Sequence, residues 1–94
     1  MIQSIGTPVR VTSNGVALAT QCNLAAFTIT AKGGDVNVTF RDGSVTGTIL
    51  WEAEADASSG SHSLAFTTPI PFPNGLYIVA DVPNFLQSVC VNLS

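Results

Sequence analysis

The sequence contains few charged residues, and basic residues are the scarcest of them. Charged side chains make up 10% of its 94 residues, whereas they make up about 25% of an average soluble domain. The only basic residues are Arg10, Lys32 and Arg41, too few to neutralise the several phosphates that a nucleic acid presents. Nucleic acid is therefore not an expected partner. With a mean hydropathy of +0.41, either something other than charge keeps the protein soluble or part of its surface is covered.

Long apolar runs and export signals are also missing. No apolar stretch approaches the roughly 20 residues of a membrane-spanning helix, so no membrane partner is expected. Residues 1–6 contain neither the basic segment nor the apolar run of a secretory signal. We therefore expect either synthesis in a cytoplasm or a mature fragment. Residues 1–6 are too short for an element and are predicted to be a flexible N-terminal arm, followed by one domain at residues 7–94.

Cysteine occurs only twice, which is too little for a disulfide-stabilised scaffold. Cys22 and Cys90 could form one bridge if the first and last strands are neighbours. They could also be two unbonded, partly buried side chains that behave as small hydrophobes. We favour unbonded thiols because the sequence carries no export signal and disulfides are rare in reducing compartments.

Residues that carry catalysis or bind metals are sparse. The single histidine, His62, lies among serines in a loop with no third group to orient it. Glu52, Glu54 and Asp56 share one face of a strand at spacings of about 6.6–6.8 Å, too wide for the three carboxylates to bind one Ca²⁺ ion unaided. We therefore predict no catalytic residue, no metal site and no cofactor, and we expect that the protein is not an enzyme.

Polar and apolar residues alternate along most of the chain, which is typical of half-buried strands. The clearest pair of strands lies at residues 35–41 and 47–54, where Asp42 and Gly43 form the turn. The prolines between residues 68 and 75 exclude a central strand there and indicate an extended connection along an edge. Other strands are predicted at residues 7–12, 16–20, 23–31, 62–68, 75–82 and 86–93.

About eight strands without a substantial helix predict an all-β fold. We expect a single β-sandwich at residues 7–94 with jelly-roll or Greek-key connections, which are the usual solutions for this number of short strands. The Ala- and Glu-rich residues 52–57 are too few for a stable helix and are interpreted as the end of a strand. The predicted core consists of Phe27, Ile29, Val36, Val38, Phe40, Ile49, Trp51, Leu64, Phe66, Leu76, Ile78, Val89 and Val91.

Strand alternation leaves several large apolar residues outside the core, and these form the candidate binding surface. A subunit interface is one interpretation, because interfaces are enriched in aromatic residues and depleted of charge. The alternative is that single exposed apolar groups are ordinary and that the two phenylalanines in proline-flanked connections cover the ends of the core. The candidate interface residues are Leu50, Phe72, Tyr77, Val79 and Phe85.

Two stretches combine turn residues with the start of a strand. Residues 40–50, FRDGSVTGTIL, place an aromatic-DG turn before a Gly-Thr-hydrophobic strand, and residues 66–77, FTTPIPFPNGLY, precede two final strands. Together they resemble small all-β virion proteins of tailed bacteriophages, over about residues 9–93. This chain departs from that pattern by Arg41 within the turn and by the prolines on either side of Phe72. Turn motifs indicate a fold better than a function.

The resemblance implies a capsid decoration or cement protein on the virion surface, synthesised in the host cytoplasm. Such a protein would bind the major capsid protein, assemble as a homo-oligomer, expected to be a homotrimer, and strengthen the shell against packaged DNA. The arm at residues 1–6 would lie on the shell and become ordered on binding.

A carbohydrate- or receptor-binding module of a fibre or a secreted protein is the alternative function. Trp51 or Tyr77 would then be the platform on which a sugar stacks. The alternation argues against Trp51 in this role, because Trp51 shares the predicted core face with Ile49.

Overall fold

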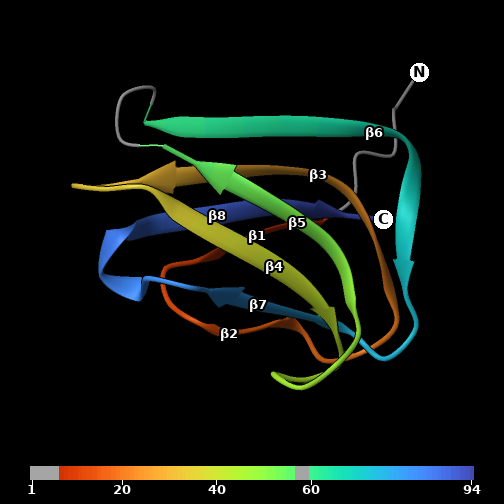
Figure 1. Cartoon of the computed structure of the whole chain (residues 1–94). Helices are drawn as coiled ribbons and strands as arrows, with labels where there is room; N and C mark the ends of the chain where they lie inside the picture. Colours follow the sequence, from red (N-terminus) through yellow and green to blue (C-terminus); the bar gives the residue numbers. More distant parts are fainter. Residues whose placement is uncertain (1–6, 57–59) are drawn as a thin grey trace.

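The computed structural model describes residues 7–56 and 60–94, which form two antiparallel four-stranded sheets (Figure 1). The predicted all-β class with about eight strands is confirmed, and the predicted arm at residues 1–6 lies outside the described residues. The strands are β1 (Thr7–Val11), β2 (Gly15–Leu18), β3 (Cys22–Ala31), β4 (Val36–Asp42), β5 (Ile49–Ala55), β6 (Ser61–Phe72), β7 (Leu76–Ala80) and β8 (Leu86–Leu93).

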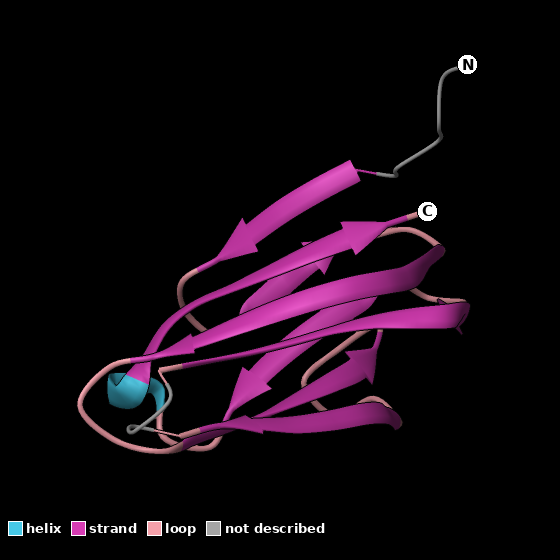
Figure 2. Cartoon of the chain, turned by 90° about the horizontal axis from the view of Figure 1, so that it is seen from above, coloured by secondary structure: helices cyan, strands magenta, loops and turns pink. Residues whose placement is uncertain are grey.

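Helical structure in the described part of the chain is limited to one 3-10 turn. This turn, η1 (Pro83–Phe85), lies at one end of the sandwich (Figure 2). Within residues 7–56 and 60–94, no helix has the length and apolar character that a membrane crossing requires. The Ala- and Glu-rich stretch at residues 52–57 continues β5 as far as Ala55, as predicted.

The strands are connected as a jelly roll. Sheet A has the order β1-β8-β3-β6, and sheet B has the order β2-β7-β4-β5. Each strand of the first half of the chain pairs with its counterpart in the second half, from β4 with β5 at the centre to β1 with β8 at the ends. The chain is therefore one long hairpin wrapped around a core. Of the jelly-roll and Greek-key connections that the sequence left open, the structure has the jelly roll.

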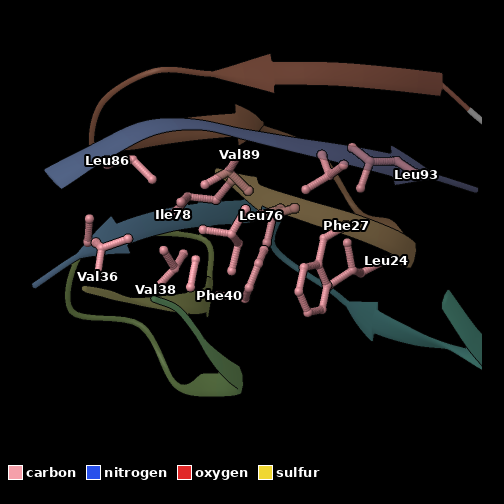
Figure 3. Packing of buried hydrophobic residues seen from close by; sticks show 14 of the residues in the cluster. Leu24, Phe27, Val36, Val38, Phe40, Leu76, Ile78, Leu86, Val89 and Leu93 are labelled. Carbon is pink, nitrogen blue, oxygen red and sulfur yellow. The ribbon is translucent and has the colours of Figure 1, made fainter. Parts of the chain in front are cut away.

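The core lies between the two sheets and uses alternate positions of their strands (Figure 3). Phe40 of sheet B and Phe27 of sheet A meet across it, with ring centroids 5.0 Å apart. Complete burial of one such side chain stabilises the fold by about 1.5–3 kcal/mol. The predicted core residues that are buried are Phe27, Ile29, Val36, Val38, Phe40, Leu76, Ile78, Val89 and Val91.

Two further predicted core residues lie at the open side of the sandwich. Trp51 and Phe66 are half-buried and pack against the core, with their rings edge to face at a centroid distance of 4.9 Å. They come from β5 and β6, which are the last strands of their sheets. An edge strand has a neighbour on one side only, so these side chains keep part of their surface in contact with solvent.

The prediction that Ile49 belongs to the core is wrong, because the pairing of β4 with β5 changes register. Phe40 is opposite Trp51, but Arg41 is opposite Ile49, so β5 has one extra residue at this point. Opposing residues share a face of the sheet. Ile49 therefore follows Arg41 to the outer face and is exposed, while Leu50, predicted to face outward, packs against the core.

The prediction that Leu64 is buried is also wrong, although its strand and face are as expected. Leu64 is opposite Phe27 and therefore on the inner face of sheet A. It stays 37% exposed because β6 is the edge of that sheet. Leu24 is fully buried but is absent from the predicted core. Regular alternation from Phe27 would turn Leu24 outward, but a register shift between Leu24 and Ala26 turns it inward.

Both cysteines are unbonded, as favoured from the sequence. Cys22 is buried on β3, whereas Cys90 is exposed on the outer face of β8. Burial raises the pKa of the Cys22 thiol, and the nearby negative charge of Asp42 raises it further. Cys22 therefore stays protonated and behaves as a small hydrophobe in the core.

Candidate docking surface

The outer face of sheet B carries a row of side chains that crosses all four of its strands. Val16 of β2 is opposite Tyr77 of β7, which is in turn opposite Arg41 of β4. Arg41 is opposite Ile49 of β5. Opposing side chains on neighbouring strands point to the same face about 4.5–5.5 Å apart, so the four form a continuous row. Val79 lies beside them, one row further along β7.

Large apolar side chains are exposed in and beside this row. Val16 is 51% exposed and Ile49 is 48% exposed, and Val45, in the loop between β4 and β5, is 50% exposed. Tyr77 and Val79 are half-buried. We call these five residues the sheet B patch. Clustered exposed apolar side chains of this kind mark sites of interaction with other molecules.

Arg41 lies between Tyr77 and Ile49 of the sheet B patch and is held in place by two hydrogen bonds. Its Nε donates to Oγ1 of Thr39 at 3.0 Å, and its Nη1 donates to the carbonyl oxygen of Val45 at 2.7 Å. A side chain that is already fixed loses less conformational entropy when a partner binds. Because apolar neighbours exclude water on docking, this guanidinium would attract a partner's carboxylate more strongly than a solvated one.

Acidic residues lie next to the sheet B patch, further along the same face. Glu52 is opposite Thr39, and Glu54 is opposite Asn37. The Asp81 carboxylate accepts a hydrogen bond from the Asn37 backbone N–H at 2.8 Å. The row that contains Arg41 therefore carries a fixed cation among apolar side chains, whereas the carboxylates lie in the next rows, with Glu52 in the same row as Val79. This asymmetry would orient a partner.

The five candidate interface residues do not form one surface. Tyr77 and Val79 lie in the sheet B patch, but Leu50 packs against the core. The prediction that Phe72 is an interface residue is wrong. Phe72 is fully buried opposite Cys22, so it presents no surface to a partner. The alternative role of covering one end of the core fits Phe72.

Phe85 lies away from the sheet B patch, on η1. A Cβ added at Gly34 would lie 2.5 Å from its ring, so the ring is in contact with the turn between β3 and β4. Phe85 is 36% exposed. It remains a separate exposed side chain and is not part of a contiguous apolar surface with Tyr77.

Sequence reasoning missed three members of the sheet B patch. Val16 and Ile49 each lie next to a register shift, and regular alternation does not reveal such a shift. Val45 could have been recognised, because it is the one large apolar residue in the polar turn GSVTG. An apolar side chain in a turn has few neighbours to cover it.

Other side chains and hollows of the described residues are weaker candidates for a binding or catalytic site. His62 is stacked on Phe27, with ring centroids 5.8 Å apart and an interplanar angle of 14°. Residues 7–56 and 60–94 contain no cluster of three or more His, Cys, Asp or Glu side chains able to hold a metal ion. A hollow of about 110 Å³ near Thr28 and Cys90 is small beside the roughly 300–1,000 Å³ of small-molecule sites. The sheet B patch is therefore the strongest candidate for a binding function.

No protein-family model matches the chain, and neither a curated protein nor a solved structure matches it. A jelly roll hosts many unrelated functions, so the fold by itself selects none of them. The functional argument consequently rests on the surface residues of this chain and on its sequence motifs.

Proposed function

We propose that the protein is a structural component of a tailed-bacteriophage virion, a decoration or cement protein that binds the major capsid protein on the outside of the shell. The observation that carries this proposal is the sheet B patch, an apolar surface beside an arginine that two hydrogen bonds hold in place. The turn motifs at residues 40–50 and 66–77 support the same role through their resemblance to such proteins.

Docking through the sheet B patch would combine apolar burial with one directed charge pair. Each square ångström of apolar surface removed from water contributes about 25 cal/mol. Arg41 would pair with a carboxylate of the shell, and Glu52 and Glu54 would face basic groups. A homotrimer, which the resemblance implies, would present three such patches at once and increase occupancy on a symmetric shell by multivalency.

Proteomic analysis of purified phage particles tests the proposal directly. The expected result is the chain in a fixed ratio to the major capsid protein in fractions that contain DNA-filled heads. Its absence from the particles, or its presence only in separated tails, would overturn the proposal.

A matched pair of variants then tests the surface. Val16→Glu places a carboxylate in the sheet B patch, whereas Val82→Glu makes the same change at a valine that is also exposed but lies outside the patch. We expect Val16→Glu to lower the affinity for purified empty shells by about tenfold or more, which corresponds to about 1.4 kcal/mol, and Val82→Glu to bind normally. Equal binding by both variants would exclude the sheet B patch as the docking surface.

The carbohydrate-binding alternative rests on Tyr77, because Trp51 lies on the inner face opposite Phe40 and packs against the core. A glycan-array signal that Tyr77→Ala abolishes, together with no binding to shells, would establish the alternative instead. Tyr77→Phe is the control, since it keeps the stacking ring and removes only the hydroxyl.

A further inference from the structure

Three of the four edge strands of the sandwich carry features that hinder pairing with another chain. β1 contains Pro8 and the charged Arg10, and β2 is only four residues long with a register shift. β5 exposes Glu52 and Glu54 and also contains a register shift. Proline, charge, shortness and bulges are the means by which edge strands avoid unwanted pairing.

The fourth edge, β6, lacks these features along its first part. Residues 61–65 contain no proline and no Lys, Arg, Asp or Glu, and they pair with β3 in a regular register. Figure 1 shows β6 at the border of the sandwich, with β3 on one side, and no strand within residues 7–56 and 60–94 pairs with its other side. A regular, uncharged edge of this kind is a template for a further strand.

The hydrogen bonding of β6 shows which of its backbone groups face the free edge. The Ala31 N–H donates to the Gly60 carbonyl oxygen at 2.8 Å. Because such bonds alternate along an antiparallel pair, the N–H and C=O groups of His62 and Leu64 point toward β3. Those of the residues between and beside them, Ser61, Ser63 and Ala65, point to the free edge.

The contact between Thr28 and Ser63 independently supports this assignment of which backbone groups point to the free edge. Side chains are closest at pairs whose backbone groups do not bond each other. Thr28 is opposite Ser63, and their hydroxyl oxygens are 2.8 Å apart. The contact also places the Ser63 side chain on the outer face of sheet A, and with it Ser61 and Ala65, which follow at intervals of two residues.

We propose that β6 pairs antiparallel with β6 of a second copy of this chain, about a two-fold axis at Ser63. In this register Ser61 lies opposite the partner's Ala65, and Ser63 lies opposite its own counterpart. The free N–H and C=O groups would form about six hydrogen bonds between the copies. All the side chains that meet on the outer face are then small and uncharged.

The side chains on the inner face argue for a second copy as the occupant. His62 would lie opposite the partner's Leu64, and Leu64 opposite the partner's His62. Leu64 is one of the exposed large hydrophobic residues of the chain, and the partner's imidazole would cover it. Self-pairing places like residues near one another, and residues 61–65 contain no Asp, Glu, Lys or Arg that this would bring together.

Pairing through β6 does not depend on the proposed function and leaves the sheet B patch free. It joins two copies about a two-fold axis and is therefore a different contact from the one that would build the homotrimer implied by the resemblance. It uses the edge of sheet A, whereas docking to a shell uses the outer face of sheet B. A contact of this length is smaller than the roughly 1,200–2,000 Å² of a stable interface, so we expect a dimer that dissociates on dilution. On a particle, neighbouring copies are held close together and the pairing is favoured.

Two double variants test the register, with Cys90→Ser as the common background to prevent disulfide-linked dimers. Ser61→Lys with Ala65→Lys places like charges opposite each other at two positions of the dimer. Ser61→Lys with Ala65→Glu places opposite charges at the same positions. By sedimentation velocity over a concentration series, we expect the first variant to dissociate at least tenfold more readily than the second. Equal dimerisation of the two, or a monomeric background protein throughout the series, would overturn the proposal.

Amide hydrogen exchange by NMR supplies a second measurement at single residues. His62 and Leu64 amides are expected to be protected at every concentration, because they bond to β3. Ser61, Ser63 and Ala65 amides are expected to become protected only at concentrations where the dimer forms. A dimer in which these three amides exchange at the monomer rate would place the interface elsewhere and overturn the proposal.

Discussion

Asp42 and Asn74 join two connections at the same end of sheet B. The Asp42 carboxylate accepts hydrogen bonds from both the backbone N–H and the side-chain Nδ2 of Asn74, each at 2.9 Å. Next to them, the Gly43 N–H donates to the Gly75 carbonyl at 2.9 Å. The end of β4 is thereby tied to the turn before β7. Since the loop that carries Val45 starts at Gly43, these bonds also anchor one side of the sheet B patch.

Asp42→Ala should destabilise the fold by about 1.5–3 kcal/mol, because it removes two hydrogen bonds to a charged group and leaves their donors without this acceptor. Urea unfolding followed by tryptophan fluorescence would measure the change. Glu54→Ala is the control, since it removes an exposed carboxylate from β5, and surface changes of this kind usually alter stability by less than about 0.5 kcal/mol. Equal losses for the two variants would show that the Asn74 contact contributes nothing.

Phe40→Ala should cost about 3–5 kcal/mol of folding free energy, because a fully buried aromatic ring is replaced by a cavity. A single small domain has a total stability of about 5–15 kcal/mol, so much of the protein should be insoluble or unfolded. Thermal unfolding of the soluble fraction is the measurement, with the exposed Val45→Ala as control. A melting temperature for Phe40→Ala close to that of the parent protein would contradict the central position of this ring.

Gly34→Ala should be destabilising because the new Cβ would lie 2.5 Å from the ring of Phe85. The ring would have to move away from the turn between β3 and β4, at a cost of about 1–3 kcal/mol. In a Phe85→Ala background the obstacle is gone, and the same change at Gly34 should be nearly neutral. A double-mutant cycle by urea unfolding measures this coupling. Independent, additive effects of the two substitutions would refute the contact.

Cys22 should make stability fall at alkaline pH. Burial, aided by Asp42, raises the pKa of this thiol in the folded state above its ordinary value of 9.0. Above pH 9.0 the unfolded chain loses a proton that the folded chain retains, so unfolding becomes more favourable. The stability that the protonated Cys22 thiol contributes is thus fully present below the pKa of the thiol in the unfolded chain. It is lost as the pH rises through the pKa of the thiol in the folded protein.

Urea unfolding between pH 7 and pH 11 would show the effect of Cys22. The free energy of unfolding should fall less with rising pH in Cys22→Ala than in the parent protein. In Cys90→Ser, where the changed residue is exposed, it should fall as much as in the parent protein. A parental pH profile in Cys22→Ala would show that other groups account for the loss. Thiol reagents should likewise modify Cys90 in the folded protein and Cys22 only after unfolding.

Much of the architecture follows from local patterns in the chain. The alternation in residues 36–40 and 76–80 identifies inward and outward faces correctly, because both segments are regular central strands whose inner face meets the opposite sheet. The Asp42–Gly43 turn ends β4 where the sequence indicates, and Gly43 has a φ of 80° that other residues rarely adopt. The prolines after residue 68 fit an edge strand, where a missing donor is tolerated.

The candidate site was harder to predict than the fold. The prediction that Tyr77 faces outward is confirmed because β7 is regular, but Val16 and Ile49 reach the outer face through register shifts. A single extra residue in one strand reverses the face of everything beyond it, and its position depends on the pairing with the neighbouring strand. Phe72 was misplaced because prolines on both sides suggested an exposed connection, whereas the residue is the buried end of β6.

The sequence by itself determined the strands, the turns and most of the residues that exclude water, because those depend on period-two alternation and on the backbone preferences of glycine and proline. Only the tertiary structure decided the jelly-roll order, the apolar row on sheet B and the unprotected border at β6. These features arise when distant segments become neighbours, and both the register between two strands and the identity of an edge strand are properties of such pairs.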